Sequence, residues 1–309
     1  MKRTRADKIF DAINVVLLTL LTFIMIYPLY FTIIASLSDQ VQVQAGNVIL
    51  WPQGITFDSY INVFSNQTIW IGYRNSIIYT VVATIYGVGM TIFCAYALSR
   101  PILKGKNIIN LFFIFTMYFG GGLIPSYMLI KSLGLINSFW VMIIPNGMSV
   151  YNMIITRTYY RTNVSLDIYE AAKIDGASEY RFFFQIAIPL SGAIIAVMCL
   201  YTGVGMWNSW FGGLLYVTDP RKYPLALILR TILTKMEELI IARSSTRGGT
   251  ATSSSVESVE DALARIENER MQAAMRYALI FVSSAPVLIA YPFVQKYFVK
   301  GVLVGSVKG

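Results

Sequence analysis

The chain has 309 residues, of which 56% are hydrophobic and only 13% are charged, and its formal net charge is +9. Soluble globular domains carry about 25% charged residues, so this chain has too few charged groups to cover a soluble body of its size. The composition therefore excludes an ordinary soluble domain and places the chain in the membrane class.

Six apolar segments approach or exceed the roughly 20 residues that a helix needs to cross a bilayer. The predicted spans are residues 13–36, 75–98, 108–130, 138–157, 186–207 and 277–295. Within these ranges the only charged residue is Arg157, at the end of the fourth span. The first apolar run is longer than the core of a typical signal peptide, which is about 7–15 residues, so we interpret it as a retained signal anchor.

The positions of Lys and Arg predict the orientation of these spans, because basic residues collect in short cytoplasmic loops. Four basic residues precede the first span, three lie between the second and third, four follow from Arg157 onward, and three lie in the C-terminal tail. The shorter loops of the opposite side hold only Arg74 and Lys131. Both termini are therefore predicted to be cytoplasmic. This distribution accounts for the net charge without a nucleic-acid partner.

The long segment 208–276 is then predicted to be extracytoplasmic. Its beginning, residues 207–229, is rich in aromatic residues and is predicted to be an ordered loop. Residues 244–256 are small and polar and predict a flexible segment, and residues 257–272 predict a short surface helix.

Three consecutive glycines, Gly120 to Gly122, precede Pro125 inside the third predicted span. They indicate either a hinge near a translocation path or ordinary close packing of membrane helices, which is the commoner cause.

The segment between the fourth and fifth spans, residues 162–185, predicts a helix, a sharp turn and a second helix. Ser165 is placed to cap the first helix and Ser178 the second, since Ser is a preferred N-cap residue. Gly176 suits the left-handed position that ends many helices.

This segment resembles the EAA loop of the permease subunits of bacterial ABC importers. That loop has Glu-Ala-Ala, a Gly six residues after the Glu, an Ile ten residues after the Gly, and a Pro three residues further on. The matching residues here are Glu170, Ala171, Ala172, Gly176, Ile186 and Pro189. The Asp175-Gly176-Ala177 form and the Ile-Pro-Leu ending are typical of carbohydrate importers, and the C-terminal tail 295–309 is also similar. The resemblance covers nearly the whole chain and is nearest to the smaller subunit of the maltose-permease type.

The resemblance implies an all-α polytopic membrane protein with the type I ABC importer permease fold, in which residues 1–309 form one transmembrane domain. It implies that helix 165–176 docks on a cytoplasmic ATPase, with Glu170 facing a basic group, Ala171 and Ala172 permitting close contact, and Gly176 setting the turn. A loop before the last span would reach an extracytoplasmic solute-binding protein. By position its members would be Trp207, Asn208, Trp210 and Phe211, although an interfacial anchor explains these residues equally well.

The resemblance also implies the partners. They are a second, homologous permease subunit, two ATPase subunits and the binding protein, assembled in the lipid bilayer of a bacterial cytoplasmic membrane. The solute is expected to be an oligosaccharide, and a polyuronate or plant-polysaccharide fragment is open. No cofactor is expected in this chain, because ATP and Mg would be used by the partner ATPase.

The sequence lacks the residues and motifs with which a transporter subunit would bind ATP or carry protons itself, so its energy source is expected to be a separate subunit. The chain has no His, no phosphate-binding Gly-x-x-x-x-Gly-Lys-Ser/Thr motif, and no carboxylate or Lys in its predicted spans. Cys94 and Cys199 both lie in apolar runs and do not indicate a disulfide or a metal site. A transporter subunit rather than an enzyme is therefore expected. The alternatives are a membrane-embedded enzyme, a channel or facilitator without ATP coupling, and, for the loop alone, an interfacial hairpin or a DNA-binding helix-turn-helix.

Overall fold

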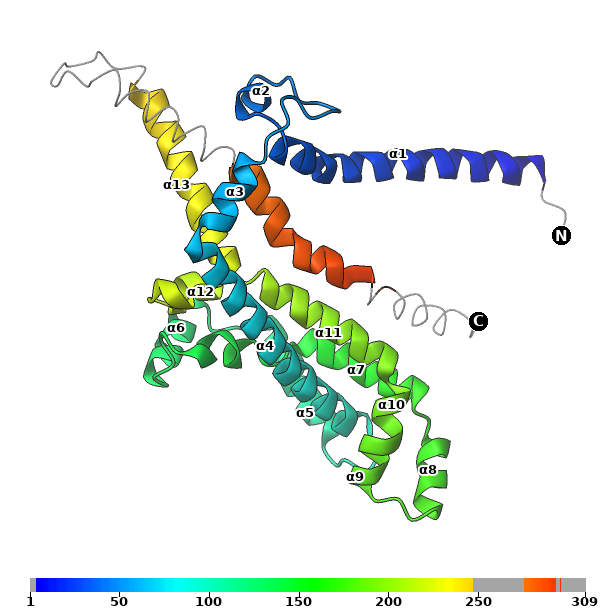
Figure 1. The fold of residues 1–309 in the computed structure, drawn as a ribbon. Helices are drawn as coiled ribbons and strands as arrows, with labels where there is room; N and C mark the ends of the chain where they lie inside the picture. The colour runs from blue at the N-terminus through cyan, green and yellow to red at the C-terminus, as the bar shows by residue number, and fades with distance from the viewer. Residues whose placement is uncertain (1–3, 247–274, 293–294, 296–309) are drawn as a thin grey trace. The chain divides into compact units, whose positions relative to one another are not determined.

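The structure, a computed structural model, describes residues 4–246, 275–292 and 295, and all regular secondary structure in these ranges is helical (Figure 1). The chain divides into two compact units. Unit 1 comprises Met1–Gln67 and Thr231–Ala285, and unit 2 comprises Thr68–Arg230 and Pro286–Gly309. The predicted elements 257–272 and most of 244–256 lie outside the described residues.

Unit 1 contains the long helix α1 (Arg5–Ser36) and the short helices α2 (Gln40–Gln44) and α3 (Asp58–Ser65). Thr4 and Asp7 form a capping box at the start of α1. Most apolar side chains of α1 are exposed in this chain, as expected for a helix that faces lipid or another membrane helix. Near its end, Phe31 contacts Tyr277 of the C-terminal helix Met275–Pro292, edge to face, with ring centroids 5.9 Å apart.

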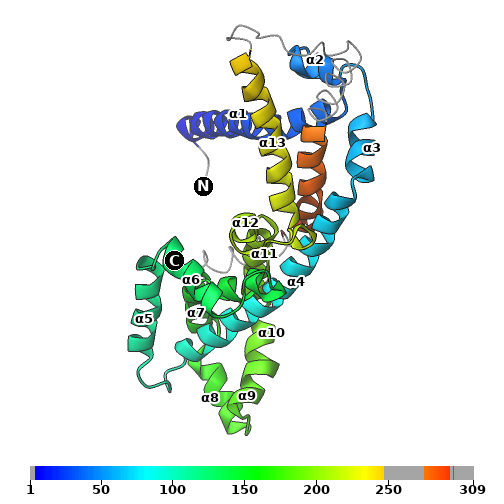
Figure 2. The same cartoon turned by 90° about the vertical axis from the view of Figure 1, so that its left-hand side faces the viewer.

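Unit 2 is built around α4 (Gln67–Ser99), which packs with α7 and α11 (Figure 1). Its remaining helices are, in chain order, α5 (Lys106–Tyr118), α6 (Leu123–Ser132), α7 (Val150–Asn163), α8 (Leu166–Ile174), α9 (Glu179–Phe182), α10 (Ile188–Leu190), α11 (Gly192–Trp207) and α12 (Phe211–Tyr216). A core of buried apolar residues joins α4 to α7, to the α8–α9 hairpin and to α11. In Figures 1 and 2 the α8–α9 hairpin lies at one end of unit 2, and α12 lies toward the other.

The six predicted spans fall on two kinds of element. Three of them fall on single long helices, namely α1, α4 and Met275–Pro292. Each of the other three falls on a pair of helical segments that meet at a sharp bend. The bends are 113° between α5 and α6, 51° between the 3-10 turns of Phe139–Asn146 and α7, and 77° between Glu179–Leu190 and α11.

Local sequence explains where two of these three spans break. The first break is at the glycine run, where Gly122 has a φ of +85°, which favours glycine. The third follows a π-helical turn, Phe183–Ala187, and Pro189 in the first turn of α10, both recognised causes of helix distortion.

The region 207–229, predicted to be a loop, is largely helical. It contains α12, and at Leu225 it enters α13 (Leu225–Thr246), a helix of 22 residues that was not predicted. Pro224 begins this helix, its carbonyl accepting from the Leu227 and Ile228 amides, and Pro is tolerated where no helical N–H is needed. Leu225, Leu227 and Ile228 are buried, so packing of this apolar turn explains the helix.

Candidate functional site

The α8–α9 hairpin has the local geometry that its sequence predicts. The Ser165 hydroxyl accepts a hydrogen bond from the Ile168 amide at the start of α8, and the Ser178 hydroxyl accepts one from the Arg181 amide at the start of α9. Gly176 lies between the helices with a φ of +77°, in the left-handed region. The predicted caps and turn are therefore confirmed.

Residues of the Glu-Ala-Ala motif lie on two different faces of α8. Glu170 and Ala171 are exposed, as are Asp175 and Gly176 at the turn. Ala172 is 7% exposed and belongs to the core of unit 2. Because Ala172 is small, α8 can pack closely against the core of unit 2. Ala171 is small and exposed, so no bulky side chain projects from the outer face of the helix at this position.

The two remaining motif residues lie further along the chain. Ile186 is half-buried in the π-helical turn and packs against the same core as Ala172. Pro189 is exposed, two residues before the 77° bend. Their positions connect the hairpin to the start of α11.

Four residues that the sequence did not single out hold this hairpin in place. The Tyr169 hydroxyl donates a hydrogen bond to Glu179, and Lys173 Nζ lies 3.6 Å from the same carboxylate. The Tyr169 ring meets the Phe182 ring edge to face, with centroids 5.1 Å apart. The two arms of the hairpin are therefore fixed to each other. The exposed face of α8 nearby includes Ile174, which is 87% exposed.

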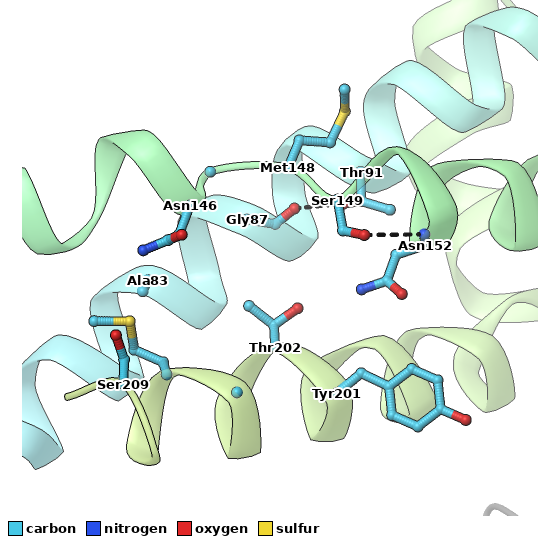
Figure 3. Close-up of a pocket in the computed structure, with 13 residues that line it drawn as sticks. Ala83, Gly87, Thr91, Asn146, Met148, Ser149, Asn152, Tyr201, Thr202 and Ser209 are labelled. Atoms are coloured by element: carbon cyan, nitrogen blue, oxygen red, sulfur yellow. Dashed lines mark hydrogen bonds between the residues drawn. The ribbon is translucent and has the colours of Figure 1, made fainter. Parts of the chain in front are cut away.

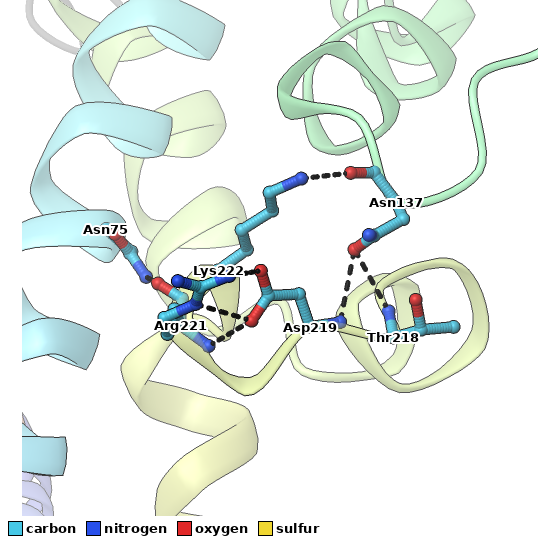
Figure 4. Close-up of polar contacts among 6 residues, drawn as sticks. All are labelled: Asn75, Asn137, Thr218, Asp219, Arg221 and Lys222. Carbon is cyan, nitrogen blue, oxygen red and sulfur yellow. Dashed lines mark hydrogen bonds and ion pairs between the residues drawn. The ribbon is translucent and has the colours of Figure 1, made fainter.

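The segment Val217–Tyr223, near the other end of unit 2, is held in place by hydrogen bonds to the side-chain amides of Asn75 and Asn137 (Figure 4). The Asn75 amide donates to the carbonyls of Arg221 and Tyr223, at 2.8 and 3.1 Å. Asn137 Oδ1 accepts from the backbone amides of Thr218 and Asp219, at 3.3 and 3.1 Å. These hydrogen bonds fix the backbone of the segment in one conformation.

Two further interactions stabilise the same segment. Lys222 Nζ donates to the Asn137 carbonyl at 2.6 Å, and the exposed Arg221 pairs with Asp219 at 3.1 Å. Hydrogen bonds from Arg221 hold the pKa of Asp219 below its ordinary value. Asn137 has a φ of +58°, and asparagine is one of the few residues that adopt this region readily.

The four residues predicted to reach the binding protein have different surroundings. Trp207 is buried and its ring lies 6.1 Å from that of Tyr73, so it packs within the chain. Asn208 donates to the Val204 carbonyl and ends α11. Trp210 is half-buried and Phe211 is 48% exposed, which leaves Phe211 as the most accessible aromatic residue of the four.

A cavity of about 390 Å³ lies between α4, α11 and the break that precedes α7 (Figure 3). Asn146, Ser149 and Asn152 lie on one side of it, and Thr202 and Ser209 lie on the other. The lining also includes Ala83, Gly87, Thr91, Gly147, Met148, Tyr201, Gly205 and Met206, and it contains no charged side chain. Amide and hydroxyl groups of this kind can donate and accept hydrogen bonds with an uncharged polar solute.

The cavity lies where the fourth predicted span is interrupted. Non-helical backbone within a membrane segment is tolerated where it lines a cavity or is buried in protein. Sequence analysis did not identify this site, because its residues come from three separate segments. The sequence signal for this site is the run 146–152, where Asn146, Ser149 and Asn152 interrupt an apolar span.

The comparisons with known proteins agree with this geometry. Residues 68–304 match the family model described as "Binding-protein-dependent transport system inner membrane component". Protein LplC of Bacillus subtilis (strain 168) is 35% identical, and the similarity covers 100% of this chain and 98% of that protein. The polygalacturonan/rhamnogalacturonan transport system permease protein YtcP of the same strain is 32% identical, over 98% of this chain and 99% of that protein.

A solved structure is also similar throughout. One chain in the crystal structure of a bacterial ABC transporter involved in the import of the acidic polysaccharide alginate has a TM-score of 0.82 and 29% sequence identity. The match covers 96% of this chain and 99% of that chain, which is consistent with the type I importer permease fold. From the family match and the full-length similarity, the chain belongs to the inner membrane components of binding-protein-dependent transport systems, and it is a permease subunit rather than an enzyme.

Proposed function

We propose that this chain is one half of a heterodimeric pathway in an ATP-driven importer of oligosaccharides, and that the α8–α9 hairpin couples the pathway to a cytoplasmic ATPase. The observation that carries the coupling role is the construction of the hairpin. Its inner residues, Tyr169 and Ala172, are fixed in the core of unit 2, and its outer residues, Glu170 and Ala171, are exposed. A protruding hairpin anchored in this way can transmit force to the spans.

The orientation follows from the charges of the loops. Basic residues flank the hairpin, which favours the cytoplasm for that end of unit 2. The hydrogen-bonded segment Val217–Tyr223, toward the end of unit 2 opposite the hairpin, would then be extracytoplasmic. The exposed side chains of Phe211, at the start of α12, and of Arg221 would then be available to contact the solute-binding protein. Both termini would be cytoplasmic, in a bacterial inner membrane, and ATP and Mg would be used by two partner ATPase subunits.

The nature of the solute is inferred from two observations. Two relatives carry names that refer to acidic polysaccharides, polygalacturonan/rhamnogalacturonan and alginate. The cavity of unit 2 is lined by amides and hydroxyls and has a volume within the range of about 300–1,000 Å³ typical of small-molecule sites. The uncharged lining favours a neutral oligosaccharide, and the names of the relatives make an oligosaccharide of uronic acids the alternative. Stimulation of ATP hydrolysis by the loaded binding protein, compared between neutral and uronate oligosaccharides, would identify the class.

Reversal of one charge tests the coupling role. Glu170→Lys is expected to abolish co-purification of the ATPase and binding-protein-stimulated ATP hydrolysis, while the chain still accumulates in the membrane. A charge on a solvated surface changes stability by about 0.5 kcal/mol or less, whereas loss of one partner of a docked ion pair costs about 2–5 kcal/mol of binding. The association should therefore weaken more than tenfold.

Asp58→Lys is the matched control, because Asp58 is an exposed carboxylate in the first turn of α3, outside the hairpin. It should leave ATPase association and hydrolysis unchanged. If Glu170→Lys also leaves both unchanged, the hairpin does not couple the chain to an ATPase, and a channel or facilitator becomes the better interpretation.

A further inference from the structure

Arg100 is a buried cation beneath the α8–α9 hairpin, directly after the last residue of α4. It is 6% exposed, and its Nε and Nη2 atoms have no hydrogen-bond partner. Among the described residues no carboxylate forms an ion pair with it. A buried guanidinium is normally paired with an acidic group, because an unpaired buried charge is costly. Its position therefore needs another explanation.

Three aromatic rings surround the guanidinium in place of a carboxylate. Arg100 Cζ lies 4.5 Å from the ring centroid of Tyr96, 5.1 Å from that of Phe182 and 5.5 Å from that of Tyr169. All three distances fall within the roughly 6 Å over which a cation is attracted to a ring face. The rings belong to α4, α9 and α8 respectively, so one side chain joins three helices.

Further hydrogen bonds and an ion pair hold the hairpin and the end of α4, which lie on either side of the Arg100 guanidinium. Tyr169 is tied to Glu179 through its hydroxyl, and Glu179 is tied to Lys173, so the two arms of the hairpin are fixed over the guanidinium. The end of α4 is fixed independently. Its Leu98 carbonyl accepts from Arg157 Nε at 3.1 Å, and the Arg100 carbonyl accepts from Lys106 Nζ at 3.4 Å. Cations at these carbonyls also suit the C-terminal end of a helix.

The helix that ends directly before Arg100, α4, also lines the cavity. Ala83, Gly87 and Thr91 lie on α4 and contribute to the cavity wall, and the same helix continues without a break to Ser99, the residue before Arg100. A displacement of the hairpin that pulls on the Arg100 side chain would therefore move a wall of the cavity. A small shift at one site is transmitted in this way when the elements between the sites are rigid.

We propose that Arg100 is a positioning residue that transmits movement of the α8–α9 hairpin to α4, through its contacts with Tyr96, Tyr169 and Phe182. The proposal rests on the coupling role proposed for the hairpin. Without the cation the hairpin can still dock on the ATPase, but its movement no longer displaces α4. ATP is then hydrolysed without matching solute movement.

The test compares Arg100→Met and Arg100→Lys in the complete transporter, reconstituted with its binding protein. The readout that separates coupling from folding is the number of solute molecules transported per ATP hydrolysed, measured together with membrane abundance and co-purification of the ATPase. Arg100→Met should keep ATPase association and lower the transport ratio at least tenfold. Arg100→Lys should recover part of the ratio, because an ammonium group still attracts ring faces but does not stack as a planar guanidinium does.

Arg161→Met is the matched control, since Arg161 is an exposed arginine on α7 in the same unit, and it should leave the ratio unchanged. If Arg100→Met does not accumulate, Tyr169→Leu compared with Tyr169→Phe decides the question, because both variants keep the cation and lose the hydrogen bond to Glu179, and only Tyr169→Leu also loses one of the three rings. A lower ratio in Tyr169→Leu than in Tyr169→Phe supports the proposal.

With intact ATPase association, an unchanged ratio in Arg100→Met, or equal ratios in Tyr169→Leu and Tyr169→Phe, overturns the role of Arg100 alone. Absence of ATPase from the purified wild-type chain would instead overturn the coupling role of the hairpin and this inference with it.

Discussion

Neighbouring alanines of the hairpin, which belong to one motif, have different surroundings. Ala172 is 7% exposed and packs in the core of unit 2, and Ala171, next to it, is exposed. The family resemblance assigns both to contact with the ATPase. In the structure only Ala171 is accessible for that contact, and Ala172 is buried within its own chain.

Enlarging each alanine in turn should separate these roles. Ala172→Leu is expected to destabilise the chain by about 1–3 kcal/mol, because a well-packed core resists extra methylene groups. Its membrane abundance and thermal stability should both fall. Ala171→Leu should leave both membrane abundance and thermal stability unchanged. It should weaken co-purification of the ATPase, because a larger side chain on the exposed face would prevent the ATPase from contacting α8 closely.

Equal loss of stability in the two variants would show that Ala171 is also buried against this chain. Unchanged ATPase association in Ala171→Leu would place the docking surface elsewhere on the hairpin.

At the scale of elements, the broken spans make the cavity possible. The interruption before α7 places Asn146 and Ser149 opposite Thr202 on α11, with α4 forming a third wall (Figure 3). In transporters of other folds, solute sites occur where membrane helices are discontinuous. The cavity is therefore expected to contact the solute during transport.

Filling the cavity should block transport without disturbing assembly. Gly205 lines the cavity, and a Cβ atom added to it would meet no other atom within 4 Å. Gly205→Trp is therefore expected to abolish solute uptake while ATPase association persists. Gly89→Trp on α4 is the control, since a Cβ atom there is equally free and Gly89 does not line the cavity. Uptake at the wild-type rate in Gly205→Trp would exclude this cavity from the pathway.

The sequence predicted elements whose signals are local. The caps at Ser165 and Ser178 and the turn at Gly176 each depend on residues a few positions apart, and all three are confirmed. The bends within three spans were harder to predict, because hydropathy records composition and not the path of the backbone. The glycine run before Leu123 and Pro189 before α11 gave visible signals for two of them.

Contacts between distant segments could not be predicted in the same way. Arg100 meets Tyr169 and Phe182 only after α4 and the hairpin pack together, and no spacing in the sequence indicates this. Helix α13 was missed for a related reason. Its Leu225–Ile228 turn is buried by tertiary contacts, and Arg230 and Lys235 further along interrupt the apolar run that a search for spans requires.

At the scale of the whole molecule, the family assignment and the mechanism depend on different evidence. The family model covers residues 68–304, and the two curated relatives match over nearly their full lengths. Those matches identify a permease subunit. The proposal that α8 docks on an ATPase in the cytoplasm depends on the exposed face of the hairpin and on the basic residues around it.

Site-specific photo-crosslinking in cells that contain the assembled transporter tests this central claim most directly. A photoreactive residue would replace Ile174, which is 87% exposed at the end of α8, or Trp51, which is 74% exposed in unit 1 and predicted to be extracytoplasmic. The account predicts an adduct between the chain and an ATPase subunit from position 174 and none from position 51. Normal membrane abundance with no ATPase adduct from position 174, or an ATPase adduct from position 51, would contradict it.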